Sequence, residues 1–165
     1  EYLKNALLLF ESTYPHLHVI AQQREMTDQQ RQKFIDSFDH RPVLGFAVMG
    51  GVFSEGIDLK GNKLIGVIVV GVGLPQVGIE RDLIKAHFPE AGFEYAYLLP
   101  GLIRVLQTAG RVIRGSSDKG IICLVDRRYL ESRYHNLLPV EWDLQSCSGI
   151  KDLEHQYTRF WSPKK

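Results

Sequence analysis

The chain has 165 residues, of which 44% are hydrophobic, and its 20 Lys and Arg against 19 Asp and Glu leave a formal net charge of +1. This composition is typical of one globular domain and excludes a disordered chain, while the near-zero charge still allows a local basic site. No apolar run approaches the roughly 20 residues that span a bilayer, and Cys123 and Cys147 have neither metal-ligand spacing nor a disulfide framework, which indicates a reducing, cytoplasmic setting.

The first elements alternate between helical and strand patterns. Residues 1–14 predict a helix that begins at once, with no leading strand, so we expect the chain to be a piece of a longer protein. Its apolar face is formed by Leu3, Ala6, Leu7, Phe10 and Tyr14. Residues 16–22 predict a short strand, and residues 27–38 predict a helix in which Thr27 and Gln30 form a capping box.

The rest of the chain continues this alternation. Further strands are predicted at residues 43–49, 64–74 and 120–126, and further helices at residues 77–88, 101–115 and 127–138. Residues 147–165 predict a short helix with an exposed SPKK tail, and Cys123 is expected to be a small buried core residue. Strands that are apolar throughout, alternating with amphipathic helices, predict one α/β domain with a mainly parallel sheet whose strands are buried on both faces.

Ligands of such sheets gather at the loops that follow the strands, which directs attention to the loops after Met49, Val72 and Val125. The first of these loops is GGVFSEGIDLKG, residues 50–61. Its glycines allow unusual backbone angles and close ligand approach, while Ser54, Glu55 and Asp58 supply a hydroxyl and two carboxylates. A long turn rich in turn-forming residues is the alternative interpretation of the same pattern.

The helix predicted at residues 101–115 carries polar donors at steps of three, four and three residues, which places them on one stripe. These donors are Arg104, Gln107, Arg111 and Arg114. The opposite stripe is apolar and comprises Leu102, Val105, Leu106, Ala109, Val112 and Ile113. Guanidinium groups suit phosphate oxygens, so the donors favour a phosphate site; a solvated basic helix face is the alternative.

Asp126 ends the strand IICLV, as a metal-binding aspartate of a nucleotide-binding protein does. The chain has no complete phosphate loop, and arginines follow Asp126 directly. We therefore expect Asp126 to cap the following helix. The histidines and cysteines show no ligand spacing and no catalytic triad, so the chain holds no complete catalytic apparatus of its own.

Taken in this order, VFSEGIDLKG and LQTAGRVIRG resemble motifs V and VI of superfamily-two DNA helicases of the DinG and XPD type. The segments VGVGLPQ, ERDLIKAHF and DKGIICLVDRRY also resemble that family, so the likeness extends from about Tyr2 to Trp142. The resemblance implies that residues 1–165 form one C-terminal, RecA-like domain with three layers, in which helices flank a mainly parallel sheet. The strand that should precede the first helix in that fold is missing from the chain.

The resemblance also implies roles for individual residues. Arg114 is expected to be the arginine finger on the γ-phosphate, with Arg111 on phosphate or in the interdomain network and Gln107 sensing the nucleotide. Glu55 and Asp58 would couple the nucleotide to the DNA-facing part of the loop. The groups nearest DNA are expected to be Gly51, Phe53 and Ser54, with packing under the loop as the alternative for Phe53. Arg104 shares the stripe but lies outside the motif.

The implied partners are single-stranded DNA and a first RecA-like domain of the same parent chain, with no membrane. That absent domain would supply most of the ATP and Mg²⁺ site, so the fragment alone is expected to be inactive. An iron–sulfur cluster is possible in the parent but not in this fragment. Two alternatives remain open: a non-catalytic module that binds single-stranded nucleic acid, and a helicase that acts on RNA or RNA–DNA hybrids.

Overall fold

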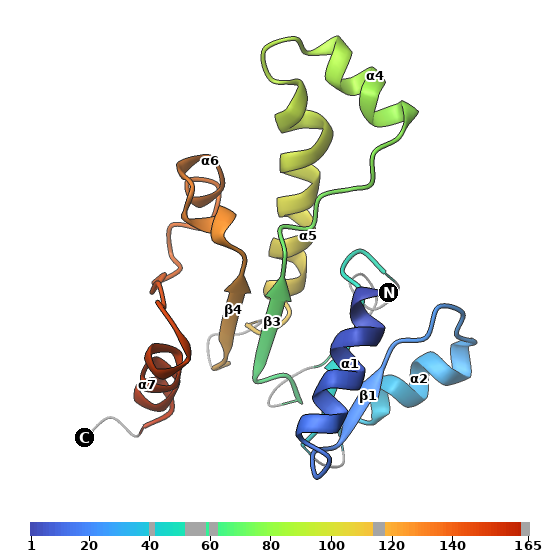
Figure 1. Cartoon of the computed structure of the whole chain (residues 1–165), viewed down its shortest axis with the longest axis vertical. Coiled ribbons are helices and arrows are strands. Elements are labelled where there is room, and N and C mark those ends of the chain that lie inside the picture. The colour runs from blue at the N-terminus through green and yellow to red at the C-terminus, as the bar shows by residue number, and fades with distance from the viewer. Residues whose placement is uncertain (40–41, 52–58, 60–62, 114–117, 163–165) are drawn as a thin grey trace.

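The computed structural model describes residues 1–39, 42–51, 59, 63–113 and 118–162. Figure 1 shows short parallel strands with helices around them. The strands are β1 (Val19–Ala21), β2 (Leu44–Phe46), β3 (Gly66–Val70) and β4 (Ile121–Val125). The helices are α1 (Tyr2–Thr13), α2 (Asp28–Asp36), α4 (Ile79–His87), α5 (Leu99–Ala109), α6 (Ser132–His135) and α7 (Ile150–Trp161), with a π-helical segment η2 (Glu94–Leu98) and a 3₁₀ segment η3 (Arg127–Leu130).

The described strands form two parallel pairs. β1 pairs with β2 in the register Val19 to Leu44, and β3 pairs with β4 in the register Gly66 to Ile121. These registers confirm the predicted parallel pairing. The alternation of strands with helices is also confirmed. Parallel neighbours need a crossover connection, and helices lie in both connections, between β1 and β2 and between β3 and β4. The expectation of one sheet is wrong for the described residues: the two pairs are separate, so each strand has one edge without a strand partner there.

The helix α2 begins with the predicted capping box. The Gln30 N–H donates to Thr27 Oγ1 at 3.3 Å, and the Thr27 N–H donates to Gln30 Oε1 at 2.8 Å. Behind this start, Phe34 is 6% exposed and packs with buried Leu59 and half-buried Ile20. We call these residues, with the half-buried hydrophobics packed against them, the α2 cluster.

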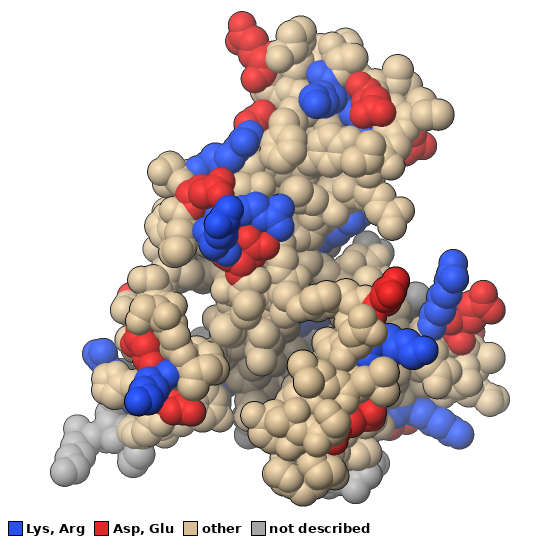
Figure 2. All heavy atoms as spheres, in the orientation of Figure 1, with Lys and Arg blue, Asp and Glu red and all other residues tan. Residues whose placement is uncertain are grey.

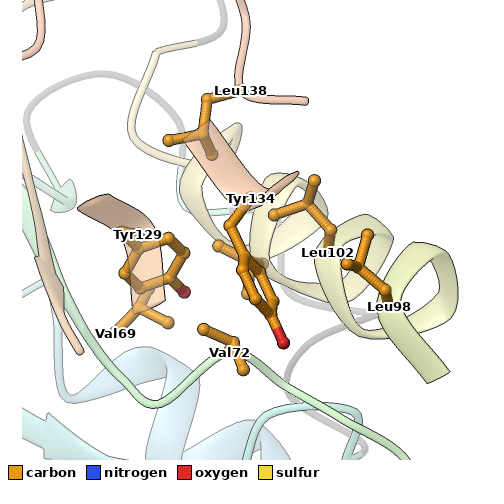
Figure 3. Packing of buried hydrophobic residues seen from close by; sticks show 8 residues of the cluster. Val69, Val72, Leu98, Leu102, Tyr129, Tyr134 and Leu138 are labelled. Carbon is orange, nitrogen blue, oxygen red and sulfur yellow. The ribbon is translucent and has the colours of Figure 1, made fainter. Parts of the chain in front are cut away.

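A larger core surrounds α5 (Figure 3). Its buried members are Val69, Val72, Leu98, Leu102, Val105, Tyr129, Tyr134 and Leu138, which we call the α5 cluster. Here α5 approaches the chain after β3 so closely that a Cβ on Gly101 would lie 2.7 Å from the Val72 carbonyl oxygen. Gly73, with φ +65°, is the reciprocal position, where a Cβ would lie 2.7 Å from the Gly101 oxygen. These glycines therefore fix α5 against the end of β3.

The single helix predicted at residues 127–138 is wrong. The chain forms η3 and α6 instead, because Glu131 between them is extended, with φ −77° and ψ 134°. Tyr129 and Tyr134 are five residues apart, which turns side chains by well over a third of a circle in a continuous helix. The break lets both rings enter the α5 cluster, and Figure 3 shows Tyr134 between Val72 and the α5 side chains.

The strand β3 departs from the prediction of burial on both faces. Val69 is 4% exposed beneath α5, whereas Ile68 and Val70 on the other face are 64% and 49% exposed. In the paired strand, Cys123 is half-buried rather than fully buried. Beyond β4, the predicted C-terminal helix is confirmed as α7, with the Lys119 ammonium 4.7 Å from the Phe160 ring centroid. Among the helices in the described ranges, none has both the length and the apolar character needed to cross a membrane.

Candidate functional site

The helix α5 presents two of the predicted donors opposite its buried side. Pro100 lies in its first turn, where a missing N–H costs no helical hydrogen bond. Leu102, Val105 and Ala109 are buried as predicted, and Leu106 is half-buried. Gln107 is exposed and Arg104 half-buried, so both side chains lie on the accessible side of the helix.

The helix α5 ends earlier than the sequence predicts, and this changes the expected alignment of its arginines. Regular helix ends at Ala109, and Gly110 follows as the C-cap. The next bonds are of the 3₁₀ type, from Arg111 N–H to the Thr108 oxygen and from Val112 N–H to the Ala109 oxygen. One continuous helical stripe from Arg104 to Arg111 is therefore wrong. Because helical spacing stops there, Ile113 is 44% exposed rather than part of the apolar stripe, whereas Val112 stays buried.

The loop after β2 opens with a tight turn. The Gly51 N–H donates to the Val48 carbonyl at 3.0 Å, which closes a four-residue β-turn. Gly50 is the third residue of this turn and has φ +79°, the left-handed value that type II turns require there. The sequence predicted unusual backbone angles in this loop, and the described turn confirms them at Gly50.

Two side chains from other elements contact this turn. A Cβ on Gly50 would lie 3.3 Å from Cδ and Nε of Arg104, so the arginine side chain lies across the glycine. From β1, Gln22 Oε1 accepts a hydrogen bond of 2.9 Å from the Val48 N–H. The structure thus brings the start of the glycine-rich loop to the helix with the polar donors.

Neither Arg104, which lies outside the motif, nor Gln22 is among the site residues that the sequence predicts. One signal could have found Gln22: it is the last residue of a predicted strand, and the loops at that end of parallel strands lie together. Among the predicted site residues, Gln107, Arg111 and Gly51 lie in the described part of the chain, with Arg111 half-buried at the end of α5. The others lie outside it: Phe53, Ser54, Glu55, Asp58 and Arg114.

In the loops after β3 and β4, polar groups bind one another within the protein. Asp126 caps η3, as predicted, by accepting from the Arg128 N–H at 2.9 Å. The Arg128 guanidinium donates to both carboxylate oxygens, and these bonds hold the pKa of Asp126 below its usual range. In the neighbouring loop, the Tyr129 hydroxyl donates to the Gly71 carbonyl at 2.7 Å. The loop after β2 is therefore the candidate site, since Val48 and Gly50 in its described turn are exposed.

Charges on the face shown in Figure 2 are mixed in sign, with Lys and Arg side chains next to Asp and Glu. Within the described ranges, no three His, Cys, Asp or Glu side chains are grouped so that they could hold a metal ion. An open hollow of about 340 Å³ lies beside the end of α1 and the start of β1, lined by residues that include Tyr14 and His18. The turn at Val48–Gly51 lies past the opposite end of β1, so the hollow is separate from the candidate site.

Comparison with known proteins identifies the fold. The family model described as "Helicase C-terminal domain" matches residues 1–145. A solved XPD helicase structure aligns with 78% of this chain and 25% of its own, with a TM-score of 0.58 and 20% sequence identity, which shows the fold. The mixed α/β arrangement of parallel strands and helices is thus RecA-like, as expected.

Curated relatives match the same region. The general transcription and DNA repair factor IIH helicase subunit XPD of Dictyostelium discoideum is 32% identical over 151 residues, covering 88% of this chain and 18% of that protein. The 3'-5' exonuclease DinG of Staphylococcus saprophyticus is 32% identical over 116 residues, covering 66% of this chain and 12% of that protein. The chain spans less than a fifth of the length of either relative. It belongs to the helicase C-terminal domain family, in the group that includes the DinG and XPD helicases.

Proposed function

We propose that this chain is the C-terminal motor domain, residues 1–165, of a longer ATP-dependent DNA helicase that couples ATP hydrolysis to translocation on single-stranded DNA. Membership of the helicase C-terminal domain family supports the proposal. The geometric observation that carries it is the contact of Arg104 with Gly50, because it joins the start of the glycine-rich loop to the helix that bears Gln107. A helicase needs such a junction, since it must couple a nucleotide site to a DNA site.

The proposed nucleotide-facing residues lie at the end of α5 and in the loop after β2. Arg114 would be the arginine finger, and Arg111 would contact phosphate or hold the interdomain network. Gln107 would sense the nucleotide; its side chain is exposed on α5 and can reach a ligand outside the domain. Glu55 and Asp58 would couple the nucleotide to DNA. ATP, when bound with Mg²⁺, supplies the phosphoryl group whose transfer the fixed guanidinium charges stabilise.

The DNA-facing residues would be Gly51, Phe53 and Ser54, which offer a backbone amide, a ring and a hydroxyl to a strand. Such groups grip the sugar–phosphate backbone and stack on bases without reading sequence. The mixed charges in Figure 2 fit a domain that contributes only part of a shared DNA track. An RNA or hybrid substrate remains the alternative that a comparison of nucleic acids would reveal.

A first RecA-like domain of the same parent is the proposed partner, and it would supply most of the ATP and Mg²⁺ site. The lengths of the relatives support a longer parent, because the chain matches 18% and 12% of two of them. A cytoplasmic location and a possible iron–sulfur cluster in the parent belong to the same proposal.

The experiment that tests the proposal is ATP hydrolysis by the full-length protein with and without single-stranded DNA. We expect Arg114→Ala to lower DNA-stimulated turnover by about 10³-fold, as removal of an arginine finger does, while DNA binding is kept. Arg127→Ala is the matched control, because this exposed arginine follows β4 and lies outside the motif. Unchanged turnover in Arg114→Ala would move the finger to Arg111. A wild-type protein that binds single strands but hydrolyses no ATP would be a binding module.

A further inference from the structure

Gln22 connects two segments that are distant in the sequence. Its backbone N–H donates to the Phe46 carbonyl at 2.7 Å, which carries the pairing of β1 with β2 one step past the end of β1. Its side-chain oxygen Oε1 then accepts from the Val48 N–H at 2.9 Å, across 26 residues of sequence. Backbone and side chain of one residue thus fix both the end of β2 and the start of the loop that follows.

The side chain also packs on the turn itself. A Cβ on Gly51 would lie 3.0 Å from Gln22 Nε2 and 3.0 Å from the Val48 oxygen, so only a glycine fits under the amide without a shift. The Arg104 side chain lies across the neighbouring Gly50. The turn is therefore contacted by an amide that follows β1 and by an arginine side chain from α5.

The turn also contacts the hydrophobic core. Met49, the second residue of the turn, packs against the α5 cluster. Its Cε atom lies 3.1 Å from where a Cβ on Gly73 would stand. Met49 therefore anchors the apolar side of the turn, while Gln22 supplies the polar restraint on the N–H of Val48, its first residue.

From these contacts we infer that Gln22 is a positioning residue for the proposed helicase, one that holds the turn at Val48–Gly51 and so sets the position of Gly51. The inference rests on the proposed function, because the DNA-facing residues of that proposal start at Gly51. Gln22 itself touches neither nucleotide nor DNA in this role. It acts through the turn, and its carboxamide oxygen is the atom that matters.

The test uses the full-length protein with three substitutions. Gln22→Leu has a similar size but no acceptor, whereas Gln22→Glu keeps an oxygen that can accept from the Val48 N–H. Gln23→Leu is the matched control, because the neighbouring side chain is exposed. The readouts are the single-stranded DNA concentration that gives half-maximal ATP hydrolysis, the melting temperature, and amide exchange of the peptide that contains Val48.

We expect Gln22→Leu to raise the half-maximal DNA concentration about tenfold, since a displaced binding element commonly costs this much. The Gln22→Glu protein should recover to within about threefold of wild type because its acceptor satisfies the same N–H. The melting temperature of Gln22→Leu should stay within about 3 °C of wild type, as expected for the loss of one exposed hydrogen bond. The control should match wild type throughout.

Two results would overturn the inference: a Gln22→Leu protein with wild-type DNA dependence, or equal defects in Gln22→Leu and Gln22→Glu. Failure of the proposed function gives a different pattern, namely no DNA-stimulated hydrolysis in wild type. Amide exchange then decides the role of Gln22 by itself. Loss of the bond should speed exchange at Val48 by about fivefold in Gln22→Leu and leave it unchanged in Gln23→Leu.

Discussion

The α5 cluster and the α2 cluster are held together in different ways. Around α5, Leu98 and Val105 are 1% and 0% exposed, and backbone meets backbone where Gly73 faces Gly101. Around α2, Phe34 and Leu59 are buried but pack mainly against half-buried neighbours, and polar bonds such as that of Gln22 hold the ends of the elements. The helix that bears the donors is thus fixed by close packing. The turn beside it is held by Met49, which packs against the α5 cluster, and by single hydrogen bonds such as that of Gln22, so the loss of one bond should cost little stability.

Shortening one leucine in each cluster tests this contrast most strongly. Leu98→Ala should lower the free energy of unfolding by about 3 kcal/mol, because its site is fully enclosed and leaves a cavity. Leu64→Ala should lower the free energy of unfolding by only about 1 kcal/mol. Leu64 is half-buried against the α2 cluster, so water and neighbouring side chains can fill the space that the substitution leaves. Urea unfolding of both variants measures the difference. Equal losses would show that the two clusters are packed alike.

A pair of glycines isolates the close approach of α5. Gly71 and Gly73 both have positive φ, at +86° and +65°, so alanine strains the backbone at either position. Gly71 has open space around a Cβ within the described chain, whereas the Gly73 Cβ would collide with the Gly101 oxygen. We expect losses of about 1 kcal/mol for Gly71→Ala and about 3 kcal/mol for Gly73→Ala in the free energy of unfolding.

The same urea titrations compare these two variants. A Gly73→Ala protein no less stable than Gly71→Ala would mean that α5 can move away from the end of β3, and that packing does not fix the helix. Gly101→Ala serves as a second check, because its Cβ would meet the Val72 oxygen from the other side.

Local patterns were enough to predict most elements. The sequence predicted three local features: the capping box at Thr27, the amphipathic face of α5 and the capping role of Asp126. Each depends only on residues that are close together in the sequence. The parallel pairing also follows from alternation of strands and helices. Periodicity failed at residues 127–138, where two tyrosines five residues apart are both drawn into the core and break the helix at Glu131.

The candidate site shows the same limit. Helical spacing placed Gln107 and Arg111 on one stripe, but the helix ends at Ala109, and nothing in the periodicity marks that end except Gly110. Gln22 was missed because its partner Val48 lies 26 residues away, on a neighbouring strand end. The sequence also could not predict that the strands form two separate pairs, since sequence patterns identify strands but not which strand edges pair with each other.

A small effect is also expected at Tyr129, whose hydroxyl binds the loop after β3 and so connects it to η3. Tyr129→Phe removes its 2.7 Å bond to the Gly71 carbonyl and should lower the free energy of unfolding by about 1 kcal/mol at pH 7. Tyr95→Phe, at a 48% exposed position, is the control and should change little. A loss as large as that of Leu98→Ala would mean that one polar bond matters as much as close packing in the α5 cluster.

The pH dependence of stability tests whether folding holds the Tyr129 hydroxyl in its protonated form. Burial raises the pKa of Tyr129 from 10.0 to about 12, so the folded state favours the protonated phenol. This contribution to stability is complete below pH 10, where the unfolded phenol is also protonated, and it is lost as the pH rises through about 12. The melting-temperature difference between wild type and Tyr129→Phe should therefore shrink between these two pH values. Both proteins keep the ring, so a difference that stays constant would show that folding does not raise the pKa of the Tyr129 hydroxyl and that burial does not favour its protonated form.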